Sequence, residues 1–154
     1  MPPWRISHGA SALTSNEQLV TRIFGNWPSF HDAEVLSVRL DRDNDGHDDG
    51  PTLEAVIHVH RMTSQIDSRG YYVAKDHTLV TLRFNRVDDL ELHDFNAQNV
   101  LFELRVEDLS ELGQEDIHFD VVFRSSYGIS AHFVCREIKV VSATPWVPPS
   151  PPRP

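Results

Sequence analysis

A histidine and two carboxylates lie within one short segment, at His31, Asp32 and Glu34. A histidine beside a carboxylate could form a catalytic dyad, and Asp32 with Glu34 could act as a general acid–base pair. Adjacent side chains in an extended segment point to opposite faces, so a direct bond between His31 and Asp32 is not expected. We expect Asp32 instead to cap a turn or short helix over residues 33–36, or to bind an arginine. A small enzyme using this cluster is an alternative function, although no second motif supplies a nucleophile.

The segment that starts at Asp41 begins like a calcium-binding loop, with carboxylates at alternate positions and Gly46 at the sixth. The twelfth position is Thr52, where such a loop requires a bidentate glutamate, and the flanking segments alternate as strands rather than helices. The segment is therefore predicted to be a solvated acidic hairpin turn, with a calcium-binding β-module as the alternative. Its densest carboxylates are the candidate partner-binding residues: Asp43, Asp45, Asp48 and Asp49.

His58 and His60 are two residues apart in a predicted strand, so their side chains share a face, together with Glu54. Two imidazoles on one face could hold a metal ion. The chain has nine histidines, so one such pair is expected from composition alone. We therefore favour a half-exposed polar strand face over a metal site.

Patterns typical of common catalytic sites are missing, because the sequence has no GxSxG, HExxH, P-loop or paired CxxC motif. The one cysteine, Cys135, lies in a predicted strand and is expected to be a buried apolar residue. A single cysteine cannot form a disulfide within the chain, and no apolar run is long enough to span a bilayer. The start of the chain lacks the apolar core of a signal peptide. We expect a cytoplasmic protein with no cofactor, no metal and no catalytic residue.

The balance of charge is acidic. The 154 residues include 23 acidic and 14 basic side chains, which gives a formal net charge of −9. A surface of this sign repels the phosphate backbone and anionic lipid, which argues against nucleic acid and membranes as partners. It favours a basic protein partner, or it serves solubility alone.

Hydrophobic spacing predicts one short helix followed by strands. The helix begins at Ser15, which forms a capping-box pattern with Gln18, and it ends at Gly25. Beyond it the apolar period is two, which is typical of β-strands. Strands are expected at 36–40, 53–59, 78–87, 90–92, 100–106, 116–124 and, as one long final strand, 128–141. The segment 64–76 is expected to be a connection with a short strand at 70–73. The predicted fold is β-rich α+β: a mostly antiparallel, curled or two-layered sheet with one short N-terminal helix.

Between the predicted helix and the first strand lies the segment WPSFHDAEV, residues 27–35. Trp27 and Phe30 are expected in the core because each can bury a large apolar area. This segment resembles the Immunity protein 50 family of bacterial polymorphic toxin systems, most closely over residues 24–42 and in a looser pattern to about residue 99. The resemblance implies a small intracellular β-rich protein that binds and neutralises a partner toxin and does no chemistry of its own.

Taken together, these patterns predict a single β-rich domain over residues 1–144 and a proline-rich extended tail over 145–154. The predicted function is stoichiometric neutralisation of a cognate bacterial toxin by a monomer or homodimer. The toxin is expected to be basic and to be attracted by the acidic surface. The motif residues of the family resemblance are Trp27, Phe30, His31, Asp32 and Glu34.

Overall fold

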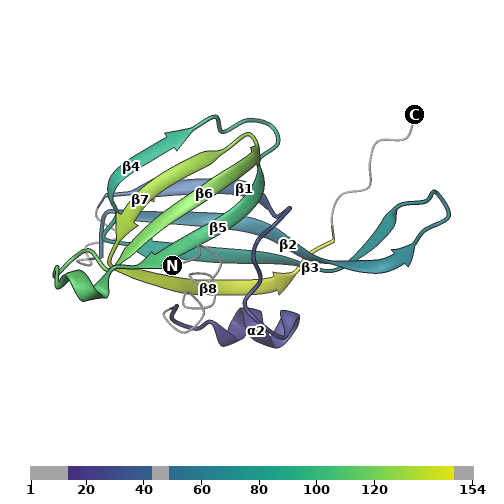
Figure 1. Cartoon of the computed structure of the whole chain (residues 1–154), viewed down its shortest axis with the longest axis horizontal. Helices are drawn as coiled ribbons and strands as arrows, with labels where there is room; N and C mark the ends of the chain where they lie inside the picture. The colour runs from purple at the N-terminus through teal and green to yellow at the C-terminus, as the bar shows by residue number, and fades with distance from the viewer. Residues whose placement is uncertain (1–13, 43–48, 148–154) are drawn as a thin grey trace.

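The computed structural model describes residues 14–42 and 49–147. Eight strands form one open antiparallel sheet in the order β4-β7-β6-β5-β1-β2-β3-β8, with a short helix beside it (Figure 1). The β-rich prediction with one short helix is confirmed. The elements are α2 (Gln18–Phe24), β1 (Glu34–Asp41), β2 (Thr52–Ile66), β3 (Tyr72–Asn85), β4 (Asp88–His93), β5 (Val100–Asp108), the 3₁₀ turn η2 (Ser110–Leu112), β6 (Phe119–Tyr127), β7 (Ser130–Cys135) and β8 (Glu137–Pro145). None of the described helices is long and apolar enough to cross a membrane.

Two very short links fold the sheet back on itself. Only Arg86 and Val87 separate β3 from β4, and only Arg136 separates β7 from β8, although each pair of strands lies near opposite edges of the sheet. The amide of Arg136 donates to the carbonyl of Asn85 (2.9 Å), and the amide of Val87 donates to the carbonyl of Pro51 (2.8 Å). Both links therefore lie at one end of the sheet. The half from β4 to β5 must then face the half from β1 to β8, as Figure 1 shows.

Aromatic rings bridge the space between the two halves. Phe84 of β3 lies 5.0 Å from Phe133 of β7 and 6.0 Å from Phe123 of β6, measured between ring centroids. All three rings are almost fully buried. Their tilted and edge-on arrangements are those that aromatic pairs prefer. These contacts make the core continuous from one half of the sheet to the other.

The single final strand predicted over 128–141 is wrong, because this stretch forms two strands that belong to opposite halves. β7 ends at Cys135, β8 begins at Glu137, and Arg136 makes the corner between them. The buried positions alternate up to Cys135 and then resume at Ile138, so the period slips by one residue at the corner. Cys135 is buried as expected, and this burial raises the pKa of its thiol far above the usual value.

The predicted capping box at Ser15 and Gln18 is also wrong. The helix α2 begins at Gln18, and no side chain caps it. Ser15 instead pairs with the edge strand β8, where its amide donates to the carbonyl of Ile138 and its carbonyl accepts from the amide of Val140. The main-chain groups of the segment before the helix are therefore used by the sheet. Gly25 ends the helix in the left-handed conformation, as predicted.

β2 and β3 run past their neighbours and form a projecting two-stranded hairpin, residues 61–75, which we call the arm (Figure 1). The pairing of β2 with β1 extends only as far as His58, and that of β3 with β8 only as far as Thr78. Among the described residues, the arm therefore has no neighbouring strand on either side. The prediction of a connection over residues 64–76 is wrong. Polar residues in this stretch hide the alternation of apolar and polar side chains that would indicate a strand.

Asp67 organises the turn of the arm. Its carboxylate accepts the amides of Arg69 (2.8 Å) and Tyr71 (3.0 Å), and these bonds lower the pKa of the Asp67 carboxyl. A two-stranded ribbon is marginally stable in water by itself, so such turn bonds matter. The arm exposes four large apolar or aromatic side chains: Met62, Ile66, Tyr71 and Tyr72.

The turn between β6 and β7 depends on Gly128. Its φ is 75°, and a Cβ placed on it would lie 2.3 Å from the carbonyl oxygen of Gln98 and 2.7 Å from Oδ1 of Asn99. Asn99 is buried, and its Oδ1 accepts the amide of Ile129 at 3.1 Å. Any side chain at Gly128 would displace this buried network.

We expect Gly128→Ala to lower the free energy of unfolding by roughly 2–4 kcal/mol, because strain at positive φ is added to a steric clash with backbone. Gly113 is the matched control, since its φ is 70° and nothing lies within 4 Å of a Cβ there. Gly113→Ala should cost only about 1 kcal/mol. Urea unfolding of the two variants measures the difference. Equal losses would show that the contacts of Gly128 with residues 98 and 99 are unimportant.

Candidate functional site

The segment WPSFHDAEV, residues 27–35, joins the two halves of the sheet. The ladder between β1 and β5 contains one regular pair, Glu34 with Val100. Irregular backbone hydrogen bonds of 2.8–2.9 Å continue this joint, from Asp32 to Leu101, from Leu101 to Ala33 and from Val35 to Asn99. The motif that carries the family resemblance thus joins β1 to β5 at the centre of the sheet.

Trp27 and Phe30 anchor the joint in the core, as predicted. Phe30 is 1% exposed, and its ring lies 5.6 Å from that of the half-buried Trp27. Phe30 also has a φ of 63°, which is rare for a bulky residue and persists only where packing enforces it. Glu34 is half-buried, and its carboxylate accepts the amide of Asn99 at 3.4 Å. Three of the five motif residues therefore have structural roles.

His31 and Asp32 are the exposed members of the motif. Nδ1 of His31 lies 2.9 Å from the carbonyl of Phe102 and must donate a proton to it. Nε2 of His31 lies 3.6 Å from Oδ2 of Asp32, and both side chains are about half exposed, at 53% and 55%. The two side chains thus approach one another, contrary to expectation, because Asp32 has a φ of 64° and the segment is not extended. The predicted cap is wrong as well, since β1 already begins at Glu34.

The exposed pair lines none of three surface grooves found on the described residues. These grooves are lined by side chains from other parts of the chain. The carboxylate of Glu34 accepts a backbone amide, that of Asn99. The arrangement therefore gives no support to the alternative of an enzyme using this cluster.

Of the four aspartates predicted to bind a partner, Asp49 is described and is exposed. Asp43, Asp45 and Asp48 lie outside the described residues. Asp49 follows them directly in the sequence, and its carbonyl accepts the amide of Arg86 at 2.8 Å. This bond brings Asp49 next to the link between β3 and β4.

A groove of about 480 Å³ opens at the same end of the sheet. Its apolar wall includes Leu40, which is 54% exposed, and its acidic residues include Asp88 and Asp89 at the start of β4. We call Asp41, Asp49, Asp88, Asp89 and this groove the acidic end. Asp88 and Asp89 fall between the strands predicted over 78–87 and 90–92, and the link that brings them beside Asp49 is a tertiary feature that the sequence does not reveal. The groove is lined by Leu40, Asp41, Arg42, Pro51, Thr52, Val87, Asp88, Asp89 and Leu90.

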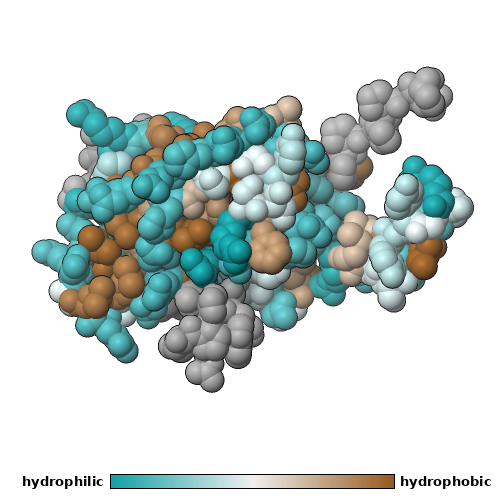
Figure 2. Space-filling model, turned by 45° about the horizontal axis from the view of Figure 1, so that its top comes forward, coloured by the Kyte–Doolittle hydropathy of each residue, from teal (hydrophilic) through white to brown (hydrophobic). Residues whose placement is uncertain are grey.

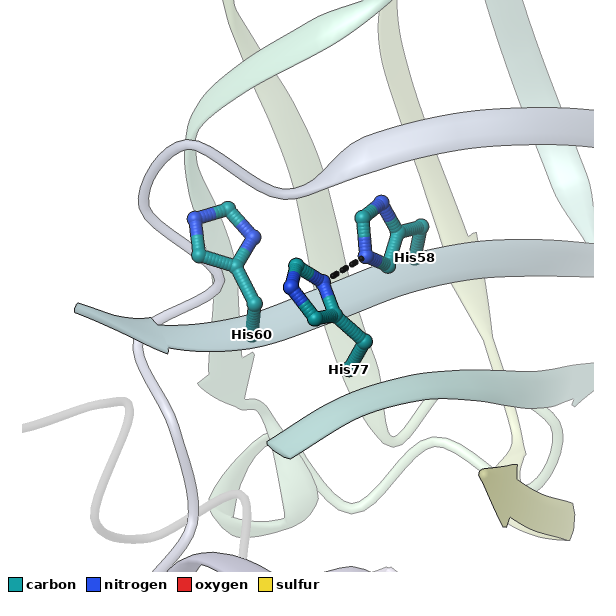
Figure 3. A group of neighbouring side chains, drawn as sticks. All are labelled: His58, His60 and His77. Atoms are coloured by element: carbon teal, nitrogen blue, oxygen red, sulfur yellow. Dashed lines mark hydrogen bonds between the residues drawn. The ribbon is translucent and has the colours of Figure 1, made fainter. Parts of the chain in front are cut away.

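His58 and His60 lie on a half-exposed strand face, as expected. The structure adds His77 from β3 to the pair (Figure 3), and the ring of Trp146 lies against His58. The three imidazoles form the one cluster among the described residues with the geometry to hold a metal ion. The sequence missed His77 because it lies seventeen residues beyond His60, across a hairpin that was not predicted.

Comparison with known families decides the classification. The family model described as Immunity protein 50 matches residues 16–146, which include α2 and all eight strands. The chain belongs to the Immunity protein 50 family. No curated protein and no solved structure matches it. Membership of an immunity protein family indicates a toxin-neutralising role, and the match extends the resemblance from the motif to the whole sheet.

In this Immunity protein 50 chain, Asp32 is expected to contribute through its backbone conformation rather than its charge. Asp, Asn and Gly tolerate a φ of 64° better than other residues. Asp32→Asn and Asp32→Gly should therefore leave the free energy of unfolding within about 0.5 kcal/mol. Asp32→Ala should lower it by about 1 kcal/mol, and Asp32→Val by more. Urea unfolding of the four variants provides the test. A loss for Asp32→Asn as large as that for Asp32→Ala would show that the carboxylate charge is what matters.

Proposed function

We propose that this protein neutralises a cognate toxin domain by binding it stoichiometrically in the cytoplasm of the producing bacterium, without catalysis. The match of the Immunity protein 50 family over residues 16–146 is the observation that carries this proposal. The structure supports it with a rigid antiparallel body and with surfaces suited to contact rather than to chemistry. The toxin is proposed to be basic, in keeping with the net charge of −9.

The acidic end is the proposed contact surface. Its described carboxylates surround an apolar groove, and the sequence places three more aspartates between Arg42 and Asp49. Specific interfaces combine an apolar centre with a polar rim, which is the arrangement found here. Figure 2 shows apolar side chains in small groups among hydrophilic ones, at the end of the body away from the arm and on the arm itself.

A lysine or arginine side chain of the toxin fits the chemistry of the groove. The aliphatic stem of such a residue can lie along Leu40, Val87 and Leu90, while its charged group reaches the aspartates at the rim. Carboxylates at the rim also attract a basic partner over long range, which raises the association rate more than the affinity. The acidic end would thus both steer the toxin and anchor it.

The arm offers a second candidate surface. Tyr71 and Tyr72 are 67% and 63% exposed, and tyrosine is enriched at the centres of protein interfaces. The arm and the acidic end lie at opposite ends of β2, on the order of 40 Å apart at about 3.3 Å per residue. A small toxin domain would therefore use one of them as its main contact, and variants at each can distinguish them.

The first experiment tests the function itself. The toxin domain encoded directly upstream of this chain is mixed with the purified chain, and complex mass and residual toxin activity are measured. We expect one toxin domain bound per chain and complete inhibition at one equivalent. Inhibition that continues far below one equivalent would require turnover and would overturn the proposal, as would the absence of a complex.

The second experiment tests the acidic end. Replacing Asp43, Asp45, Asp48 and Asp49 with asparagine should leave the free energy of unfolding within about 0.5 kcal/mol, since the sequence pattern of this segment predicts a solvated turn. Association with the toxin domain should slow on the order of tenfold at low salt and lose much of its salt dependence. Stopped-flow rates across a salt series measure both effects. An unchanged rate at low salt would remove this segment from the mechanism.

A matched pair of single substitutions sharpens that test. Asp89 and Asp94 stand at the two ends of β4, both are exposed, and their φ values of 54° and 60° are equally tolerant of asparagine. Each substitution by asparagine removes one charge. Asp89→Asn should slow association more than Asp94→Asn, because only Asp89 belongs to the acidic end. A larger effect of Asp94→Asn would place the contact at the opposite end.

A further inference from the structure

Three histidines converge where the arm leaves the sheet. His58 and His60 come from β2 and His77 from β3, and Figure 3 shows the three rings side by side on one face of the hairpin. Their ring centroids are 5.1–5.7 Å apart. The opposite face of this hairpin supplies core residues such as Ile57 and Val80, so the backbone that carries the rings is firmly held.

A bulge in β3 creates the cluster. The pairs Val59–Thr78 and Arg61–Lys75 enclose one residue of β2, His60, but two residues of β3. The extra residue is Asp76, which adopts a φ of 56°. A bulge of this kind redirects a side chain locally, and here it places His77 opposite His60. Bulges are enriched beside functional sites.

The ring nitrogens have the spacing of a metal site. One ligand nitrogen from each histidine lies within 4.8 Å of the others, and Nε2 of His58 is 2.9 Å from Nδ1 of His77. Three imidazoles around a zinc ion sit roughly 3–3.5 Å apart, since each Zn–N bond is about 2.0–2.1 Å. Nitrogens that are up to 4.8 Å apart would have to approach one another by up to about 1.5 Å, which side-chain rotations of the three histidines can supply.

One feature of the cluster is poorly explained by packing alone. Within the described chain, Nδ1 of His60 is buried and has no hydrogen-bond partner, which is unusual for a ring nitrogen. A bound cation would give this nitrogen a partner and remove the cost of leaving it unpaired.

We propose that His58, His60 and His77 bind a divalent transition-metal ion of the zinc class, with a fourth coordination position open to water or to another ligand. Neutral imidazole is a preferred ligand of such ions, and three histidines with an open position are a known arrangement for zinc. The ion would link β2 to β3 at the base of the arm. This site is separate from the acidic end and does not depend on the toxin-binding proposal.

The environment keeps the rings ready to bind. The pKa of His58 is lowered from 6.5 to about 4, mainly by burial and to a smaller extent by the neighbouring His60 and His77. Burial and, to a smaller extent, the neighbouring His77 also lower the pKa of His60, whereas the charge of Asp32 raises it. His58 is therefore unprotonated at pH 7, so a metal ion would not have to displace a proton from its lone pair. Metal affinity should fall as the pH is lowered toward the range in which the imidazoles protonate.

Calorimetric titration of the untagged protein with Zn²⁺ at pH 7 tests the site. We expect one ion per chain, with His60→Gln and His77→Gln each weakening binding by at least tenfold, since loss of an outer-shell partner alone costs about 10–100-fold. His93→Gln is the control, because His93 is an exposed histidine of β4 outside the cluster. No saturable binding up to millimolar Zn²⁺ would overturn the proposal, as would equal affinities of the parent, His60→Gln and His77→Gln proteins.

A second measurement is independent of the folding of any variant. Co²⁺ added to the unmodified protein should develop the intense visible bands of a four-coordinate, nitrogen-ligated ion. It should also quench the indole of Trp146, whose ring lies 4.5 Å from that of His58. A spectrum that remains that of hexa-aqua cobalt would contradict the assignment.

Discussion

The two short links at one end of the sheet are the constraint on which the rest of the structure depends. Because Arg136 alone joins β7 to β8, and Arg86 with Val87 joins β3 to β4, the two halves of the sheet cannot lie flat. The two halves face one another across a core in which the ring of Phe84 packs against that of Phe133. The family motif at residues 27–35 joins the two halves at the centre of the sheet. The same links bring the start of β4 beside Asp49 and so build the acidic end. At the other end no link restrains β2 and β3, which therefore project as the arm.

Local patterns in the sequence were enough to predict most strands, the end of the helix at Gly25 and the burial of Phe30. They failed where the backbone departs from a regular period. The corner at Arg136 and the bulge at Asp76 each change which side chains share a face, and neither residue is a glycine or proline that would mark the change. The capping box predicted at Ser15 failed for another reason. The amide of Ser15 pairs with β8, which is far away in the sequence.

The candidate surfaces likewise contain residues that the sequence reveals and residues that only the fold brings together. The aspartates around residue 45 and the histidine pair on β2 are visible as dense local clusters in the sequence. Asp88 and Asp89 come close to Asp49, and His77 joins the histidine pair, only through tertiary pairing. Membership of the Immunity protein 50 family indicates a toxin-neutralising role for the chain, and these exposed surfaces are the proposed contact sites for that role.

The central claim is that a toxin binds at the acidic end. Hydrogen–deuterium exchange of the chain, alone and saturated with the toxin domain encoded upstream, tests it most directly. The account predicts slower exchange in the complex for the amides of residues 49–53 and 86–90, with the arm, residues 61–75, unchanged. Protection confined to the arm, with residues 86–90 exchanging as in the isolated chain, would contradict it.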